Sequence, residues 1–172
     1  MINNTFCLER IYNWKGALIE YDQSFEEGYK EHRKNSIYRI CDAQKVDYVD
    51  LLKDFPVNID YLQIDLEVDN KSTLNTLILL NETVFDKYKF ATVTFEHDIY
   101  RGNYFDTREI SRKIFADRGY VLLFSDVTVF VEGGYKPFED WYVHPDLVDP
   151  EFLKLKGSGD YFDLLKLFSA AK

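Results

Sequence analysis

Apolar residues recur along this chain with two alternating periods. Short apolar runs bounded by turn residues predict strands, and segments with an apolar residue every three or four positions predict helices. The predicted strands cover residues 17–20, 36–41, 59–64, 90–95, 120–124 and 127–131, and the predicted helices cover residues 4–12, 24–32, 47–54, 73–80, 106–118 and 160–171. Because strand and helix alternate at spacings that require crossover connections, we expect an α/β fold with a mostly parallel sheet.

The last third of the chain has a different pattern. A short turn at Ser125-Asp126 predicts that the last two strands form an antiparallel hairpin. Residues 135–150 are then interpreted as irregular and residues 157–159 as a linker. The sequence therefore predicts one α/β domain over residues 1–150 and a C-terminal tail with an amphipathic helix over residues 151–172.

Three of the predicted strands end in acid. Glu20, Asp65 and Glu96 each close a short apolar run. In open α/β sheets, ligands bind outside the carboxyl ends of the strands, where carboxylates can accept hydrogen bonds from hydroxyls or amines, or hold a metal ion. We therefore expect these three side chains to share one pocket.

Composition narrows the class of protein. The chain has 172 residues, of which 17% are aromatic, and a formal net charge of −9. That length suits one packed domain, and the negative charge makes nucleic acid an unsuitable partner. The apolar stretches are too short for a membrane span and the first residues lack a signal-peptide pattern, so we expect a cytoplasmic protein with no membrane contact. Cys7 and Cys41 are expected to be free thiols without a chemical role.

Two acidic segments are the candidates for chemistry. Asp65, Glu67 and Asp69 alternate, so on an extended backbone their carboxylates would face one side and could recruit a cation. In the Glu-His-Asp segment at residues 96–98, His97 is the candidate general base, because imidazole is the side chain that changes charge near neutral pH. An imidazole beside two acids can also be held in a structural ion pair, and both interpretations stay open.

The order and spacing of these features resemble the FkbM-type family of S-adenosylmethionine-dependent methyltransferases. The resemblance spans about residues 3–143 and rests on five motifs: Asn4-Thr5-Phe6-Cys7-Leu8-Glu9, Trp14-Lys15-Gly16, Glu20, Asp65-Leu66-Glu67 and Glu96. It implies a Rossmann-like class I methyltransferase fold, with a mostly parallel sheet, helices on both faces and a C-terminal antiparallel hairpin.

The resemblance also implies roles for individual residues. Glu20 would accept hydrogen bonds from the two ribose hydroxyls of S-adenosylmethionine, and Asp42 and Ala43 would contact its adenine ring. Asp65 and Glu67 would lie beside the methyl-transfer site, with Glu96 at the following strand. The expected cofactor-binding residues are thus Glu20, Asp42, Ala43, Asp65 and Glu67, and the expected catalytic residues are His97, Asp65 and Glu96. No residue is assigned as a dedicated metal ligand, although a divalent cation held by Asp65 and Glu96 could lower the proton affinity of an acceptor hydroxyl.

The chain departs from the family at its start. In the family, a first strand and a glycine-rich turn precede the first helix, and this strand lies in the centre of the sheet. The fold is therefore expected to be truncated at its N-terminus. Three explanations are open: a start site placed too late, a fragment whose missing part comes from another chain, and a degenerate relative that no longer methylates. An exposed sheet edge would also invite self-association into a homo-oligomer.

Three functions follow from these observations. The first is methylation of a hydroxyl on a sugar, a glycan or another small molecule. The second is a non-catalytic remnant that binds a partner chain through its open sheet edge. The third is a metal-dependent nucleotide-sugar transferase, in which the acidic segment at residues 65–69 binds the metal and the diphosphate.

Overall fold

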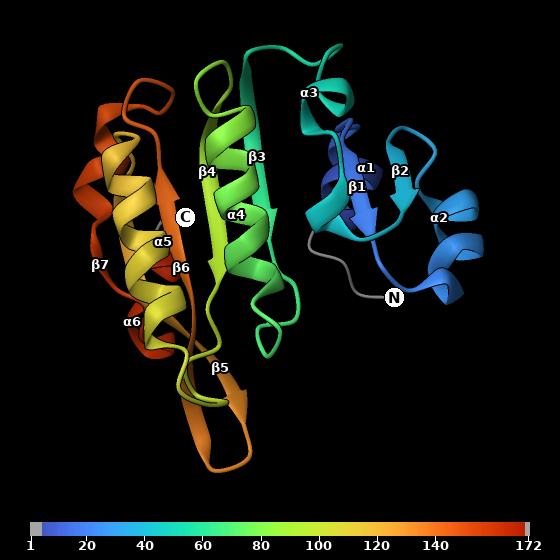
Figure 1. Ribbon diagram of the computed structural model, residues 1–172. Helices are drawn as coiled ribbons and strands as arrows, with labels where there is room; N and C mark the ends of the chain where they lie inside the picture. Colours follow the sequence, from blue (N-terminus) through green and yellow to red (C-terminus); the bar gives the residue numbers. More distant parts are fainter. Residues whose placement is uncertain (1–4, 171–172) are drawn as a thin grey trace. The chain divides into compact units, whose positions relative to one another are not determined.

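Two separate β-sheets organise the chain (Figure 1). The computed structural model describes residues 5–170, so Asn4, at the start of the first motif, lies outside the described residues. The chain divides into one unit of residues 1–54 and a second unit of residues 55–172. Helices alternate with strands in both units, which confirms the α/β class. The division at residue 150 that the sequence suggests stays a prediction.

The first unit contains a two-stranded parallel sheet. Its elements, with η for short 3-10 helices, are α1 (Phe6–Tyr12), β1 (Ala17–Glu20), η1 (Gln23–Phe25), α2 (Glu26–His32), β2 (Ile37–Ile40), η2 (Ala43–Lys45) and α3 (Tyr48–Leu51). The pairing runs from Ala17 opposite Ile37 to Glu20 opposite Ile40. Parallel strands need a crossover connection, which η1 and α2 supply here.

A buried carboxylate joins α1 to the segment that precedes β2. Glu9 is 4% exposed and accepts hydrogen bonds from Arg33 Nε at 2.8 Å, from the backbone N–H of Asn35 at 2.8 Å and from Ser36 Oγ at 2.7 Å. Burial alone would raise the pKa of Glu9, but the hydrogen bonds from Ser36, Asn35 and Arg33 hold it below its ordinary value. Glu9 and Arg33 are both buried, and because Arg33 Nε lies 2.8 Å from Glu9 Oε2, each neutralises the charge of the other.

The second unit contains a five-stranded mixed sheet. Its elements are β3 (Asn58–Ile64), α4 (Ser72–Thr83), β4 (Lys89–Glu96), α5 (Phe105–Asp117), β5 (Val121–Val131), β6 (Gly134–Val143), η3 (Pro150–Leu155), β7 (Gly157–Ser158) and α6 (Tyr161–Ala170). The strand order is β3-β4-β6-β5-β7. The pairs β3–β4 and β5–β7 are parallel, whereas β4–β6 and β6–β5 are antiparallel. The expectation of a mostly parallel sheet is therefore wrong for this unit, because β6 returns between β4 and β5.

The expected antiparallel hairpin is present, but its turn lies elsewhere. β5 runs through Ser125-Asp126, which form an irregularity within the strand instead of the hairpin turn. The chain reverses after residue 131, where Gly133 has a φ of 89° that glycine adopts without strain. The stretch expected to be irregular supplies β6. Pro137 argues against a central strand, yet at Pro137 β6 pairs only with β5, so this proline stands in an edge environment.

The predicted linker at residues 157–159 is also part of the sheet. β7 pairs in parallel with β5, and the chain after it passes so close that a Cβ on Gly159 would lie 2.3 Å from the backbone of Val127. The predicted C-terminal helix is confirmed as α6, and it packs Leu164 into an apolar cluster with β5 and β6.

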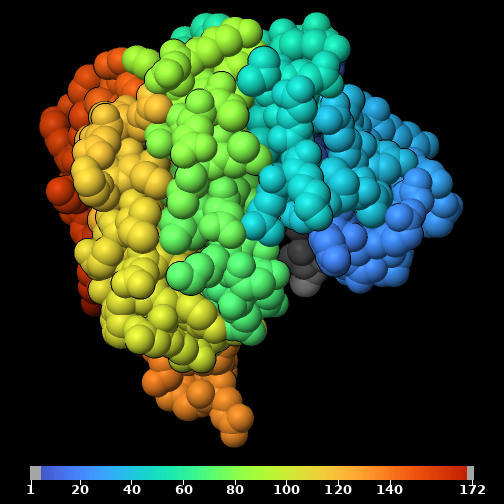
Figure 2. Space-filling view, viewed as in Figure 1, coloured from blue at the N-terminus to red at the C-terminus, as the bar shows by residue number. Residues whose placement is uncertain are grey.

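α4 and α5 cover one face of the five-stranded sheet (Figure 1), and their green and yellow atoms adjoin in Figure 2. The core beneath them is aromatic. Phe115 of α5 is fully buried, and its ring centroid lies 5.9 Å from that of Phe95 and 4.4 Å from that of Tyr142. Phe95 and Tyr142 thus mark the helix-covered face of β4 and β6. Among residues 5–170, no helix has the length and apolar content needed to cross a membrane.

The Glu9 network predicts a large effect of a small change. Glu9→Gln leaves the buried Arg33 guanidinium without a counter-charge and should lower the free energy of unfolding by about 3 kcal/mol. Urea denaturation of the full chain, with hydrogen exchange of residues 5–54, measures this loss. Glu27→Gln is the matched control, because the Glu27 side chain is 86% exposed and, among residues 5–170, pairs only with Lys30. Equal urea midpoints for the two variants would contradict the assignment.

Candidate functional site

Three carboxyl groups lie in one line across β3, β4 and β6. Ile64 of β3 is opposite Phe95 of β4, so the next residues, Asp65 and Glu96, are also neighbours. Glu96 in turn is opposite Glu139 of β6. Successive side chains of a strand point to opposite faces, so these three carboxyls share the face that is opposite to Phe95. We call Asp65, Glu96 and Glu139 the carboxylate row.

Glu96 is the central member of the carboxylate row and carries a proton at neutral pH. Its side chain is buried, and burial is the main cause that raises its pKa to about 11. Contacts with the carboxyl groups of Asp65 and Asp98 add to the effect, because a second negative charge beside them is unfavourable. Glu96 therefore acts as a neutral acid that can donate a hydrogen bond.

Glu139 differs from Glu96 because it changes charge near neutral pH. Burial raises its pKa to about 7, the indole of Trp141 works against the shift, and the charges of Asp65 and Asp140 add to it. The indole N–H of Trp141 donates to Glu139 Oε1 at 2.7 Å, which favours the ionised form. A carboxylate that titrates near neutrality suits proton transfer, so Glu139 is the best general base of the carboxylate row.

Further polar groups extend the same face along β3 and β4. The side-chain amide of Gln63 donates to Asp65 Oδ2 at 3.0 Å. Two residues before Gln63 and Glu96, and therefore on the same face, the hydroxyls of Tyr61 and Thr94 form a hydrogen bond of 2.7 Å. This half of the sheet therefore presents donors and acceptors where a packed sheet would present aliphatic side chains, and it suits a hydroxyl-rich ligand.

The acidic segment after β3 is split between two partners. β3 ends at Ile64, so the backbone from residue 65 to residue 69 is not the extended strand that the sequence analysis assumed. Asp65 belongs to the carboxylate row, whereas Glu67 and Asp69 lie 3.1 and 3.7 Å from the guanidinium of Arg101. Asp98 also binds Arg101, at 3.0 Å. Asp65, Glu67 and Asp69 therefore do not form one cation site, and the expectation that they recruit a cation together is wrong.

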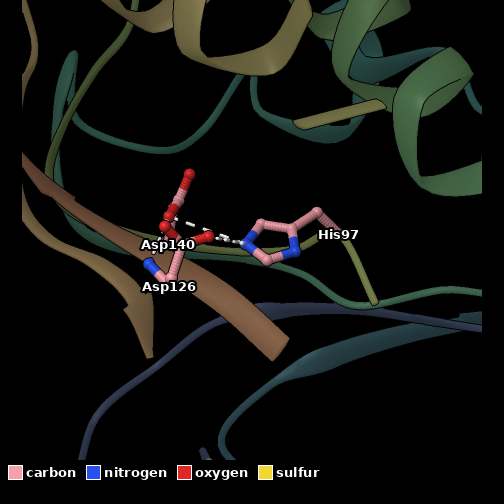
Figure 3. Close-up of side chains that lie close together, drawn as sticks. All are labelled: His97, Asp126 and Asp140. Carbon is pink, nitrogen blue, oxygen red and sulfur yellow. Dashed lines mark hydrogen bonds and ion pairs between the residues drawn. The ribbon is translucent and has the colours of Figure 1, made fainter. Parts of the chain in front are cut away.

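His97 lies apart from the carboxylate row, in a second cluster. Its side chain is fully buried, and Nε2 points at Asp126 of β5 and Asp140 of β6, 3.6 Å from Oδ1 of each (Figure 3). Burial alone would raise the pKa of Asp140, but contacts with His97 and Arg112 hold it well below its ordinary range. Ligand atoms of His97, Asp126 and Asp140 lie within 4.8 Å of one another, so this cluster can hold a metal ion.

The predicted cofactor residues of the first unit have local roles in turns. Glu20 is half-buried, and its Oε1 accepts a hydrogen bond from the backbone N–H of Asp22 at 2.9 Å. Asp42 caps η2 by accepting from the N–H of Gln44, and the carbonyl of Ala43 accepts from a tyrosine hydroxyl. Because Glu20 belongs to the first unit and Asp65 and Glu96 to the second, their shared pocket stays a prediction.

Sequence reasoning missed Glu139, Asp126 and Asp140. All three depend on β6, which was interpreted as irregular, and on the irregularity in β5. One signal was available: residues 127–131 are followed by Glu132, two glycines and then the aromatic-rich segment 138–143, and two such runs joined by glycines are typical of a hairpin. That hairpin alone would not have paired Glu139 with Glu96, because their pairing joins β6 to β4 and not to β5.

The raised pKa of Glu96 has a measurable consequence for stability. In the unfolded chain Glu96 ionises near its ordinary pKa of 4.5, but in the folded protein only near 11, so the folded state loses stability as the pH rises above 4.5. Glu96→Gln is neutral at every pH. The Glu96→Gln variant should have a Tm that is higher by at least about 2 °C near pH 8 and nearly unchanged near pH 4.

Thermal unfolding at the two pH values measures the difference. Glu82→Gln on the exposed surface of α4 is the control, with no change expected at either pH. A Glu96→Gln variant whose Tm shift is the same at both pH values would show that Glu96 is ionised in the folded protein.

No family model matches the chain, and no curated protein and no solved structure shows significant similarity to it. The resemblance to FkbM-type methyltransferases therefore rests on the sequence motifs alone.

Proposed function

We propose that this protein is an S-adenosylmethionine-dependent methyltransferase of the FkbM type, which methylates a hydroxyl group of a sugar or another small molecule. The observation that supports this proposal is the carboxylate row. It gathers one acid that titrates near neutrality and one acid held neutral at the carboxyl ends of two parallel strands, where α/β sheets bind their ligands.

The row suits the demands of methyl transfer to oxygen. S-adenosylmethionine supplies the methyl group on a sulfonium, which leaves as a neutral thioether when the acceptor oxygen forms its bond to the methyl carbon. The acceptor hydroxyl must lose its proton, and ionised Glu139 takes that proton. Neutral Glu96 donates a hydrogen bond that orients the acceptor, and Asp65 accepts one. His97 has no part in this step, because it is fully buried in the other cluster.

The residues of the first unit fit part of a nucleoside. Glu20 stands at the end of β1, and one of its carboxylate oxygens is fixed by the Asp22 N–H while the other has no hydrogen-bond partner among residues 5–170. A carboxylate held in this way can accept hydrogen bonds from ribose hydroxyls. The Asp42 carboxylate already caps η2 and pairs with Lys45 at 3.1 Å, so an adenine contact at this turn falls to its backbone.

A non-catalytic remnant is the second candidate, and the sheet topology favours it. Among the described residues, β3 pairs only with β4, and β1 pairs only with β2 in a separate sheet. Each sheet therefore has a strand with one unpaired edge among the described residues, and such an edge can pair with a strand of a partner chain. A remnant would keep the fold of each unit without binding the cofactor.

Binding of the cofactor separates the two candidates. Isothermal titration of the full chain with S-adenosylhomocysteine should release or absorb heat with one site per chain, and Glu20→Ala should weaken binding at least about tenfold through loss of the ribose contact. Glu27→Ala, an exposed change on α2, is the control. A chain that ignores S-adenosylmethionine and its product but binds a sugar nucleotide with manganese would refute the methyltransferase proposal.

The role of Glu139 predicts a distinctive pH profile. Methyl transfer to a panel of sugar acceptors, followed by release of S-adenosylhomocysteine, should rise with pH through about 7 as Glu139 ionises. Glu139→Gln should reduce kcat about 10²- to 10⁴-fold and abolish this rise, with the affinity for S-adenosylhomocysteine unchanged. Glu132→Gln at the exposed hairpin turn is the matched control. An unchanged pH profile in Glu139→Gln would assign the base elsewhere.

A further inference from the structure

The geometry points to a tetrahedral divalent-metal site of the zinc class, formed by His97 Nε2, Asp126 Oδ1 and Asp140 Oδ1 at the base of the β5–β6 hairpin. This site is separate from the carboxylate row, because Asp140 follows Glu139 directly in β6 and points to the opposite, helix-covered face. The inference does not depend on the proposed methyltransferase function.

The first argument is the state of the His97 imidazole. Its side chain has no exposed surface, and among residues 5–170 neither ring nitrogen has a partner within hydrogen-bond distance; the Asp126 and Asp140 oxygens nearest to Nε2 are 3.6 Å away. Buried polar atoms in native proteins nearly always have a partner, so a fully buried imidazole without one calls for an explanation. Nε2 points between two carboxylates, and Figure 3 shows both on the same side of the ring. A cation bound at this place would give that nitrogen its partner.

The second argument is the spacing of the three ligand atoms. The Nε2 atom lies 3.6 Å from each of the two carboxylate oxygens, which is too long for a hydrogen bond. Two ligands bound to one zinc ion at about 2.0–2.1 Å and at the tetrahedral angle are about 3.4 Å apart, whereas a right angle would bring them to about 3.0 Å. The two Nε2–Oδ1 distances are therefore closer to the tetrahedral than to the octahedral value, and the three ligand atoms lie within 4.8 Å of one another.

The third argument is that neighbouring residues hold the ligands from outside. Arg112 Nε donates to Asp140 Oδ2 at 2.8 Å, and Tyr142 donates to the same oxygen at 3.1 Å. Arg112 also lies 3.1 Å from Asp126 Oδ2. Arg112 thus binds both oxygens of Asp140 and Oδ2 of Asp126, and it fixes the positions of the two carboxylates beside His97. Metal-binding carboxylates are commonly oriented by outer hydrogen bonds of this kind.

Two arginines also compete with an ion. Arg108 Nη1 lies 3.0 Å from Asp126 Oδ1, and Arg112 Nη2 lies 2.9 Å from Asp140 Oδ1, which also accepts from the backbone N–H of Asp126. Arg108 is the easier one to displace, because it has a second partner in Glu109 at 3.3 Å. Asp126 is about one-third exposed, so an ion can reach the site from the side of Arg108.

The proposed ion would connect three strands at one point. His97 directly follows β4, Asp126 lies at the irregularity of β5, and Asp140 lies in β6. Three protein ligands leave a fourth position for water. Because the unfolded chain does not present this arrangement, binding should also raise Tm.

Cobalt(II) is the probe for this site, because tetrahedral cobalt gives intense visible absorption bands and octahedral cobalt only weak ones. Titration of the full chain should give intense bands at one ion per chain, and zinc should abolish them by displacement. Asp126→Asn should weaken cobalt binding roughly 100-fold, and Arg108→Gln should strengthen it about tenfold by removing the competing guanidinium. Asp146→Asn, an exposed change after β6, should have no effect.

The two variants keep the test decisive. A stronger affinity in Arg108→Gln cannot arise from misfolding, whereas a weaker affinity in Asp126→Asn could. The titration is repeated with Cys7→Ser and Cys41→Ser, since thiolates also bind cobalt, and unchanged spectra in these variants support the site. Absence of intense bands in the unmodified chain, or equal cobalt affinity in the unmodified chain, Asp126→Asn and Arg108→Gln, would overturn the inference.

Discussion

The pairing of β4 with β3 on one side and with β6 on the other is the constraint on which the second unit depends. This register places Asp65, Glu96 and Glu139 in one line and, one residue away, Asp140 beneath α5. A shift by one residue would exchange the two faces and bury the carboxylate row beneath the aromatic core. The packing of Phe95 and Tyr142 against Phe115 therefore also fixes where the ionisable groups stand.

The adjacent acids Glu139 and Asp140 show how strongly the partner decides the charge of a buried carboxylate. Both are almost completely buried, and burial is the largest influence on both. Asp140 faces Arg112, the Asp126 N–H and His97, and these contacts keep it ionised. In the part of the chain that the structure describes, the Glu139 side chain accepts a hydrogen bond only from the indole N–H of Trp141, so burial prevails and the pKa of Glu139 rises to about 7. These two carboxylates are adjacent in the sequence, and their difference in charge follows from the opposite faces of β6 to which they point.

The sequence allowed most elements to be predicted, because their patterns are local. The strands that begin at Ala17, Ile37, Asn58 and Lys89 and the helix after Asp160 all follow from apolar spacing. β6 was not predicted, because proline has no N–H to donate and is uncommon in a central strand. At Pro137 the pairing with β4 has already ended, and only the fold reveals this. The proximity of Asp65 and Glu96 could be anticipated from parallel neighbours. Their partner Glu139, and the cluster of His97 with Asp126, required the long-range pairing that only the fold supplies.

The two clusters represent two solutions to the same physical problem, the burial of several carboxylates in one sheet. On the helix-covered face, guanidinium groups neutralise Asp126 and Asp140, which gives fixed charges and a well-held arrangement. On the other face no arginine contacts Glu96 or Glu139 among the described residues, so protons neutralise these acids. A proton leaves and returns far more readily than a guanidinium does, and this face is therefore the one equipped for proton transfer. The arginine-paired face is equipped to hold strands together, and its buried imidazole gives it the donor set to do so through a metal ion.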